Sequence, residues 1–109
     1  MRSRVVFADR KLKEAFERLK DSTAEDRKLH KWLNRAFDEI AKDAFRGIQI
    51  PKRLIPGKYI KRYGIENLWK YDLPGAWRLL YSVARDEVIV VSIILERLPH
   101  KDYERRFGY

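Results

Sequence analysis

Residues 67–83 read NLWKYDLPGAWRLLYSV and contain the clearest strand pattern of the chain. On both sides of Pro74-Gly75, apolar side chains recur at every second position, the spacing of a strand with one buried face. Pro followed by Gly is a turn signal. The residues expected on the apolar faces are Trp69, Tyr71 and Leu73 before the turn and Trp77, Leu79, Tyr81 and Val83 after it. The stretch therefore predicts a β-hairpin.

Further strands are predicted on either side of this hairpin in the chain. A polar turn at Arg85-Asp86-Glu87 leads into residues 88–95, which read VIVVSIIL. A nearly all-apolar run of this length is typical of a central strand covered on both faces. Near the start of the chain, Val5-Val6-Phe7 predicts a short strand that ends at Asp9, a good helix N-cap. This first strand is expected to insert beside one of the later strands, and the sequence does not fix which.

Two helices are predicted after the first strand, and a basic segment, residues 48–65, follows them. From residue 10 to residue 20, apolar residues fall at i, i+3, i+4 and i+7. Ser22 and Glu25 have the form of a capping box that begins a second helix. Its apolar stripe extends to Phe45, and Gly47 is expected to end it in the left-handed conformation. The two apolar stripes predict a helical hairpin.

The segment from residue 48 to residue 65 is basic and is interrupted by prolines and glycines, so it is expected to be a loop or a single helical turn. Tyr59 and Tyr63 alternate with its cations, a composition suited to phosphate contact and base stacking. The alternative is that Tyr59, Ile60 and Tyr63 attach the segment to the core while the cations are solvated. The predicted RNA-binding cations are Lys52, Arg53, Lys58, Lys61 and Arg62.

Together these elements predict one α+β domain over residues 1–109, because this length suits a single core. The expected order is β-α-α-β-β-β, with a short C-terminal tail or helix. The helical hairpin is expected to pack on one face of a mainly antiparallel four-stranded sheet. The opposite face is expected to be concave or exposed.

Composition narrows the class of function. The net charge of +9 and the pI near 9.9 favour polyanionic partners, although a basic surface without a partner has the same composition. The chain has no cysteine and two histidines, so no disulfide, metal site or cofactor is expected. We find no apolar run long enough to span a membrane and no signal peptide, which predicts a cytoplasmic protein without a membrane partner. One Met and few Asn and Gln residues resemble the composition of heat-adapted proteins.

Two motifs carry a family resemblance. Residues 67–83, and Trp77-Arg78-Leu79-Leu80-Tyr81 above all, resemble the core pattern of the RelE/ParE toxin superfamily. In that pattern a basic strand turns through a glycine-containing loop into an aromatic-Arg-aliphatic-aliphatic-Tyr strand. The tail His100-Lys101-Asp102-Tyr103 resembles the basic-then-tyrosine ending of many members, and the predicted element order is also similar.

The resemblance, which is to the RelE-like branch, implies a toxin of a type II toxin-antitoxin pair that cleaves messenger RNA on the ribosome without a metal and so inhibits translation. The ribose 2′-hydroxyl would attack the adjacent phosphate, which requires a base, cations and a proton donor. Arg78 would stabilise the phosphate charge, Tyr103 would stack on or orient a base, and Lys101 and Lys70 would add cations. His100 is the candidate base. The implied partners are the ribosome, messenger RNA and a cognate acidic antitoxin that covers the helices or the concave sheet face.

Several residues leave alternatives open. Asp72 would repel phosphate, and Lys70 is a single cation where the family pattern has several. Arg78 is alternatively an edge arginine that pairs with Asp72 across the hairpin. Tyr103 and His100 also suit a docked tail and a surface histidine. The alternative functions are a non-catalytic or gyrase-directed family member and a basic RNA- or ribosome-binding protein.

Overall fold

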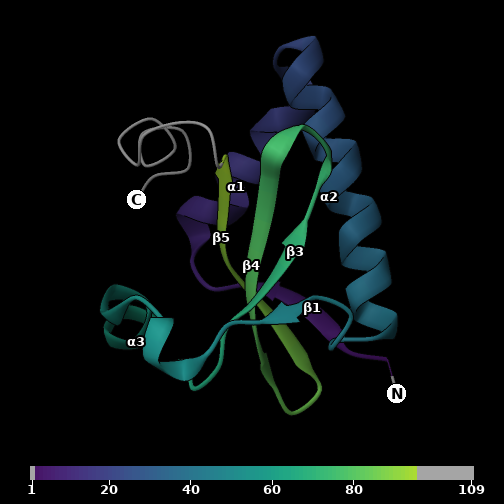
Figure 1. Ribbon diagram of the computed structural model, residues 1–109. Coiled ribbons are helices and arrows are strands. Elements are labelled where there is room, and N and C mark those ends of the chain that lie inside the picture. Colours follow the sequence, from purple (N-terminus) through teal and green to yellow (C-terminus); the bar gives the residue numbers. More distant parts are fainter. Residues whose placement is uncertain (1, 96–109) are drawn as a thin grey trace.

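The computed structural model describes residues 2–95 and shows a mixed sheet with helices (Figure 1). Its strands are β1 (Arg4–Phe7), β2 (Ile48–Gln49), β3 (Trp69–Asp72), β4 (Trp77–Ala84) and β5 (Glu87–Leu95), and its helices are α1 (Arg10–Arg18), α2 (Ala24–Lys42) and α3 (Gly57–Tyr63). Short 3-10 turns lie at Leu19–Asp21, Lys52–Leu54 and Pro74–Ala76. The predicted α+β class is confirmed.

The sheet has five strands in the order β1-β5-β4-β3-β2. β1 runs parallel to β5, and every other neighbouring pair is antiparallel. The prediction of four strands is wrong because β2, two residues long, adds to the edge of β3. A pair of residues is too short for a period of two to be recognised. The predicted order also lacked α3, which lies between β2 and β3.

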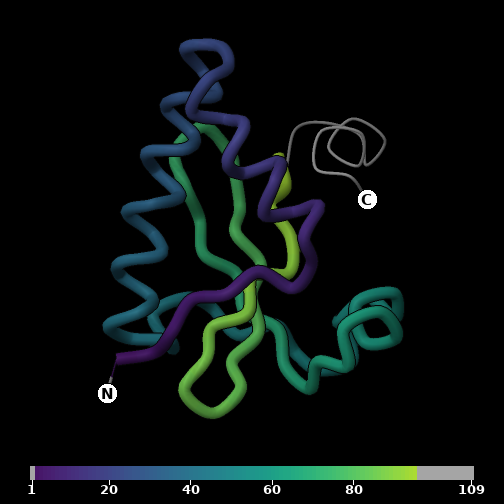
Figure 2. Tube along the Cα trace, turned by 180° about the vertical axis from the view of Figure 1, so that it is seen from behind, coloured from purple at the N-terminus to yellow at the C-terminus, as the bar shows by residue number. Residues whose placement is uncertain are grey.

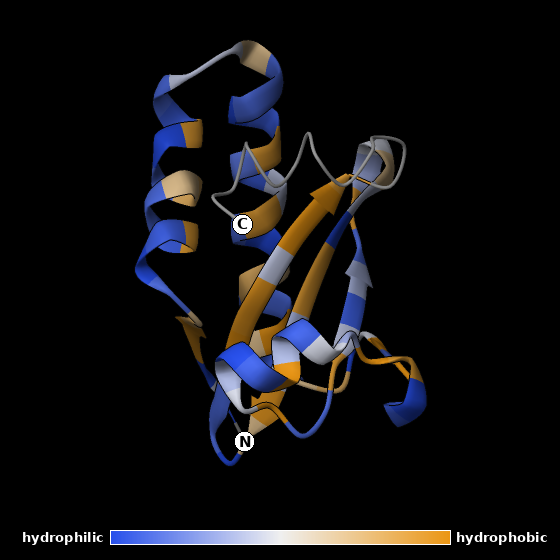
Figure 3. Cartoon of the chain, turned by 90° about the vertical axis from the view of Figure 1, so that its left-hand side faces the viewer, coloured by the Kyte–Doolittle hydropathy of each residue, from blue (hydrophilic) through white to orange (hydrophobic). Residues whose placement is uncertain are grey.

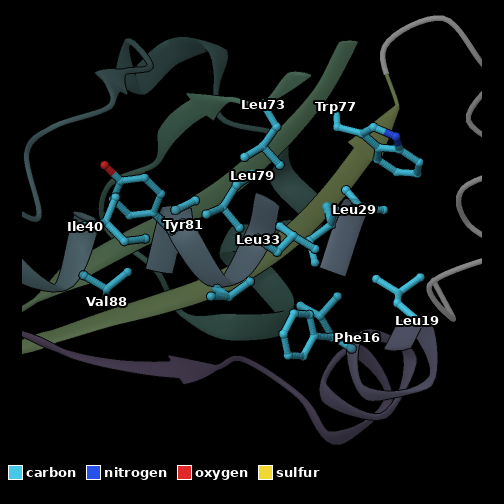
Figure 4. Packing of buried hydrophobic residues seen from close by; sticks show 14 of the residues in the cluster. Phe16, Leu19, Leu29, Leu33, Ile40, Leu73, Trp77, Leu79, Tyr81 and Val88 are labelled. Carbon is cyan, nitrogen blue, oxygen red and sulfur yellow. The ribbon is translucent and has the colours of Figure 1, made fainter. Parts of the chain in front are cut away.

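One face of the sheet is covered by α1 and α2, and we call it the helical face. Figure 3 shows the two helices as a layer beside the apolar strands, and Figure 4 shows how the side chains meet between the layers. The fully buried members of this core include Leu12, Leu29, Leu33, Ile40, Leu79, Tyr81, Val88, Val90 and Ile93. The predicted helical hairpin is therefore confirmed.

The cross-strand register confirms the period of two in the hairpin. Trp69 pairs with Tyr81 and packs, like Tyr81, in the core under the helices. The alternate residues point to the other side of the sheet, where Asp72 pairs with Arg78. We call this side the α3 face, because α3 packs there through Tyr59 in a second apolar cluster (Leu80, Val91, Ile55, Ile65 and Leu68).

The α3 face is thus partly covered, and the prediction that it stands open is wrong in part. Figures 1 and 2, taken from opposite sides, both show α3 standing away from α2. α3 was not predicted because a helix of seven residues with three cations and no acid has too little apolar periodicity to be distinguished from a loop by its sequence.

The helix ends follow the prediction at one position and depart from it at two. The side chain of Asp9 accepts a hydrogen bond from the Leu12 N–H and caps α1, as predicted. Thr23, not Ser22, caps α2, because its hydroxyl accepts from the Asp26 N–H while Ser22 donates to the Asp26 carboxylate. α2 ends at Lys42, so Gly47 is not its cap.

Gly47 is needed for a close approach instead. A Cβ at this position would lie 2.4 Å from the Lys70 carbonyl oxygen and 2.7 Å from the Tyr81 hydroxyl. Contacts this short do not occur at real Cβ atoms, so only glycine lets the chain after α2 pass so close to the backbone of β3 and the Tyr81 side chain of β4. The sequence showed the glycine but not this reason for it.

Candidate nucleic-acid interface

Two of the predicted catalytic residues, Lys70 and Arg78, lie on neighbouring strands of the α3 face. Lys70 is on β3 opposite Leu80, and Arg78 is on β4 opposite Asp72. Residues that are paired across two strands lie on the same face of the sheet as the pair two positions further along. The pairs Lys70–Leu80 and Asp72–Arg78 are related in this way. The sheet therefore brings Lys70 and Arg78 to one surface.

The Arg78 guanidinium makes the ion pair that the sequence left as an alternative. Its Nε lies 3.1 Å from Asp72 Oδ1. The Arg78 side chain is 27% exposed, whereas that of Asp72 is 60% exposed. An incoming phosphate would therefore meet a carboxylate beside the arginine, and the two anions would compete for the same cation.

The five predicted RNA-binding cations lie on the short turn Lys52–Leu54 and on α3, and all of them are exposed. Within residues 2–95, no ion pair involves Lys52, Arg53 or Lys61. Lys58 places its Nζ 5.4 Å from the centre of the Tyr59 ring. The five cations belong to the basic segment, residues 48–65, which adds a positive surface to the side of the sheet that carries Lys70 and Arg78.

Arg62 differs from the rest of the basic segment because it is part of a structural contact. Its guanidinium lies 3.2 Å from Asp9 Oδ2 and sits 5.5 Å from the centre of the Tyr63 ring. Tyr63 donates its hydroxyl to the same carboxylate oxygen at 2.8 Å. Burial, followed by this hydrogen bond, raises the pKa of Tyr63 to about 12. Asp9 thus joins α3 to the beginning of α1, and Arg62 belongs to this joint.

The tyrosines of the basic segment face the protein. Tyr59 is buried in the second apolar cluster, and Tyr63 is half-buried against Asp9. The base-stacking interpretation is therefore wrong for Tyr59, and the attachment of the segment to the core is confirmed for both rings. Ile60, which was expected to take part in that attachment, is 44% exposed, so its part of the prediction is wrong.

The other predicted residues fall into two groups. His100, Lys101 and Tyr103 lie outside the described residues, so their predicted roles stay predictions. His30 is half-buried and stacks on Phe16 with ring centres 4.6 Å apart, and its Nδ1 lies 3.3 Å from the Asn34 amide. These contacts give His30 a structural role.

Two residues have structural features that the sequence did not predict. Asp9 was identified as a helix cap but not as the anchor of α3, because its partner Tyr63 lies 54 positions away in the chain. Phe45 was assigned to the apolar stripe of the second helix, yet its side chain is 64% exposed. The signal that α2 ends before Phe45 is the C-cap Asp43, which the sequence pattern did not single out.

Within residues 2–95, no cluster of three or more metal-ligating side chains is present. In the same part of the chain, no helix combines the length and the apolar character required to cross a membrane. Comparison with protein-family models, with curated proteins and with solved structures found no match in any of the three.

Proposed function

We propose that this chain is an RNA-directed toxin of the RelE/ParE type, a metal-independent endoribonuclease that cleaves messenger RNA on the ribosome and acts in the cytoplasm. We also propose that the fold is RelE-like in two parts, the helical hairpin and the antiparallel β3-β4-β5 unit. β2 and α3 are then additions of this chain.

The observation that carries the proposal is that Arg78 and Lys70 share one face of the sheet with the basic segment. Arg78 lies on the strand Trp77-Arg78-Leu79-Leu80-Tyr81, whose aromatic and aliphatic positions are buried. The arginine is thereby held on a rigid strand, as stabilisation of a developing phosphate charge requires. A guanidinium also matches the geometry of two phosphate oxygens.

The reaction can be written from the residues of the proposal. The ribose 2′-oxygen attacks the adjacent phosphorus and loses its proton to His100 as base. Arg78, with Lys70 and Lys101, stabilises the added negative charge on the phosphorane. The 5′-oxygen of the next nucleotide then leaves with a proton from a donor, which gives a 2′,3′-cyclic phosphate and a free 5′-hydroxyl. Tyr103 would orient the base beside the cut.

The Arg78–Asp72 ion pair favours a second candidate. If Asp72 holds Arg78 permanently, the α3 face binds without cleaving, and the chain is a non-catalytic or gyrase-directed family member or a basic RNA- or ribosome-binding protein. The basic segment and the net charge of +9 serve this function equally well.

The proposed protein partner is an acidic antitoxin. A segment with an apolar side and acidic residues would complement the positive surface of this chain and exclude RNA from it. We expect a short acidic open reading frame beside the gene.

Induced expression of the full chain tests the proposal. We expect growth arrest and message cleavage with the wild type, and loss of both with Arg78→Ala and with Tyr103→Ala, which removes the ring proposed to orient the base. Arg35→Ala is the matched control, because Arg35 is an exposed arginine on α2 and its removal changes the net charge equally. Normal growth with intact messages would overturn the nuclease and leave the binding function.

A further inference from the structure

Phe45 is an exposed aromatic ring on a turn that is firmly held. Its side chain is 64% exposed, the largest value among the exposed large apolar residues of the described part. The ring packs on Trp69 with centres 5.2 Å apart, and Trp69 in turn stacks on the buried Tyr81 with an angle of 17° between the planes. One side of the Phe45 ring is thus supported by two further rings.

The backbone around Phe45 is fixed from several directions. Tyr81 donates its buried hydroxyl to the Ala44 carbonyl at 2.9 Å and accepts from the Gly47 N–H at 3.1 Å. The Phe45 N–H donates to Asp43 Oδ1 at 3.1 Å. A ring that the protein fixes this strongly and still leaves exposed is pre-organised for a contact, because ordering it on binding would cost little entropy.

Phe45 also forms one wall of a hollow of about 260 Å³ on the helical side of the sheet. Lys42 at the end of α2 and Arg85 in the β4–β5 turn line the same hollow, together with Asp43 and Asp86. This volume is below the roughly 300 to 1,000 Å³ of pockets for drug-sized ligands, so it suits a single ring system.

Arg85 has an unusual backbone. Its φ of 55° lies in the left-handed region, which a two-residue hairpin turn requires at its first position. Glycine or asparagine would meet this requirement with less strain. The chain instead places an arginine there, which adds a cation at the rim of the hollow.

We infer that this hollow binds one unpaired base of single-stranded RNA, with the base stacked on Phe45 and the adjoining phosphate on Lys42 and Arg85. The identity of the ligand rests on the proposed RNA-directed function. The site itself is separate from Lys70 and Arg78, because it lies on the helical side of the sheet and they lie on the α3 face. The aromatic ring suits the base and the two cations suit the phosphate, while Asp43 Oδ1 accepts the Phe45 N–H and Asp86 is a second carboxylate of the lining.

Binding of a fluorescent single-stranded RNA 12-mer to the full chain tests the inference. Phe45→Ala is expected to weaken binding about tenfold, the scale of one lost aromatic-base stack. Its matched control is Ile48→Ala, because Ile48 is 59% exposed, lies three positions away and does not line the hollow. Binding of a blunt RNA duplex should not respond to Phe45→Ala, because a paired base cannot enter the hollow.

Arg85→Gly separates a binding role from a structural one. Glycine relieves the left-handed backbone, so the melting temperature should stay equal or rise while single-strand affinity falls and depends less steeply on salt. If affinity and melting temperature both fall, Arg85 has only a structural role in the β4–β5 turn, which would contradict the inference.

The two proposals fail in distinguishable ways. A variant with Lys52, Arg53 and Lys61 changed to Gln weakens RNA binding if the α3 face acts as proposed. If this variant binds more weakly while Phe45→Ala binds like the wild type, the hollow is not a site and the proposed function stands. If the wild type binds no single-stranded RNA, or if Ile48→Ala weakens binding as much as Phe45→Ala, the inference is overturned.

Discussion

Tyr63 and Asp9 lie 54 positions apart in the chain and are joined by a hydrogen bond of 2.8 Å from the tyrosine hydroxyl to the carboxylate. The other oxygen of the same carboxylate accepts the Leu12 N–H and caps α1. One aspartate therefore begins the first helix and fixes α3, the element that carries Lys58, Lys61 and Arg62. The position of α3 therefore depends on a residue near the start of the chain.

Replacement of Asp9 tests this double role. Asp9→Ala removes the N-cap and the charged partner of Tyr63 and Arg62, and we expect the free energy of unfolding to fall by about 1–3 kcal/mol. Asp9→Asn keeps a capping oxygen and should cost less. Urea unfolding measures both, with Asp38→Ala, an exposed aspartate on α2, as the control. Equal stability of Asp9→Ala and Asp38→Ala would contradict the role.

Alkaline pH should loosen the same joint. The pKa of Tyr63 is raised from 10.0 to about 12 by burial and by the hydrogen bond to Asp9, so the folded state favours the protonated hydroxyl. Its contribution to stability is complete below pH 10 and is lost as the pH rises toward 12. The melting temperature of the wild type should therefore fall more steeply over this range than that of Tyr63→Phe. Parallel curves would show that Tyr63 does not contribute through this proton.

The two glycines Gly47 and Gly57 should respond oppositely to alanine. At Gly47 the new methyl group would meet the Lys70 carbonyl oxygen at 2.4 Å, whereas at Gly57 nothing lies within 4 Å. We expect Gly47→Ala to lower the free energy of unfolding by more than about 2 kcal/mol. Gly57→Ala in α3 should leave it unchanged or raise it by up to about 1 kcal/mol. Denaturant unfolding measures both, and a tolerated Gly47→Ala would refute the close packing of residues 43–47 on β3.

Asp72 should restrain RNA binding. Asp72→Asn removes the negative charge beside Arg78 while keeping the size of the side chain, and we expect affinity for single-stranded RNA to rise about fivefold at low salt. Asp38→Asn, which removes the same charge from the outside of α2, is the control for net charge. Weaker binding by Asp72→Asn than by this control would mean that Asp72 positions Arg78 for its ligand.

The sequence predicted the central part of the fold because its signals are local. The alternation around Pro74-Gly75 predicted β3 and β4, and the apolar run from residue 88 predicted an inner strand. The helical stripes predicted α1 and α2, and Asp9 was recognised as a cap. Each of these patterns extends over enough residues for its period to be read.

The remaining features depend on contacts between distant residues. β2 is defined only by its pairing with β3, and the parallel pairing of β1 with β5 has no signature in either strand. The exposure of Phe45 follows from the early end of α2 and from the contacts of Tyr81 with Ala44 and Gly47. At the candidate site, the sequence predicted Lys70 and Arg78 on neighbouring strands but not the part of Arg62 in the joint with Asp9.

In the proposed function, Arg78 takes part in cleavage of messenger RNA on the ribosome. Purified wild type, Arg78→Ala and Arg35→Ala are added to ribosomes stalled on a labelled message and to the same message alone, and the ends of the products are mapped. We expect cuts only in ribosome-bound message, with 2′,3′-cyclic phosphate ends, and wild-type activity of Arg35→Ala. Arg78→Ala should cleave at least about a hundredfold more slowly, as expected when a charge-stabilising group is lost. Intact message in every reaction, or equal cleavage by Arg78→Ala and wild type, would contradict it.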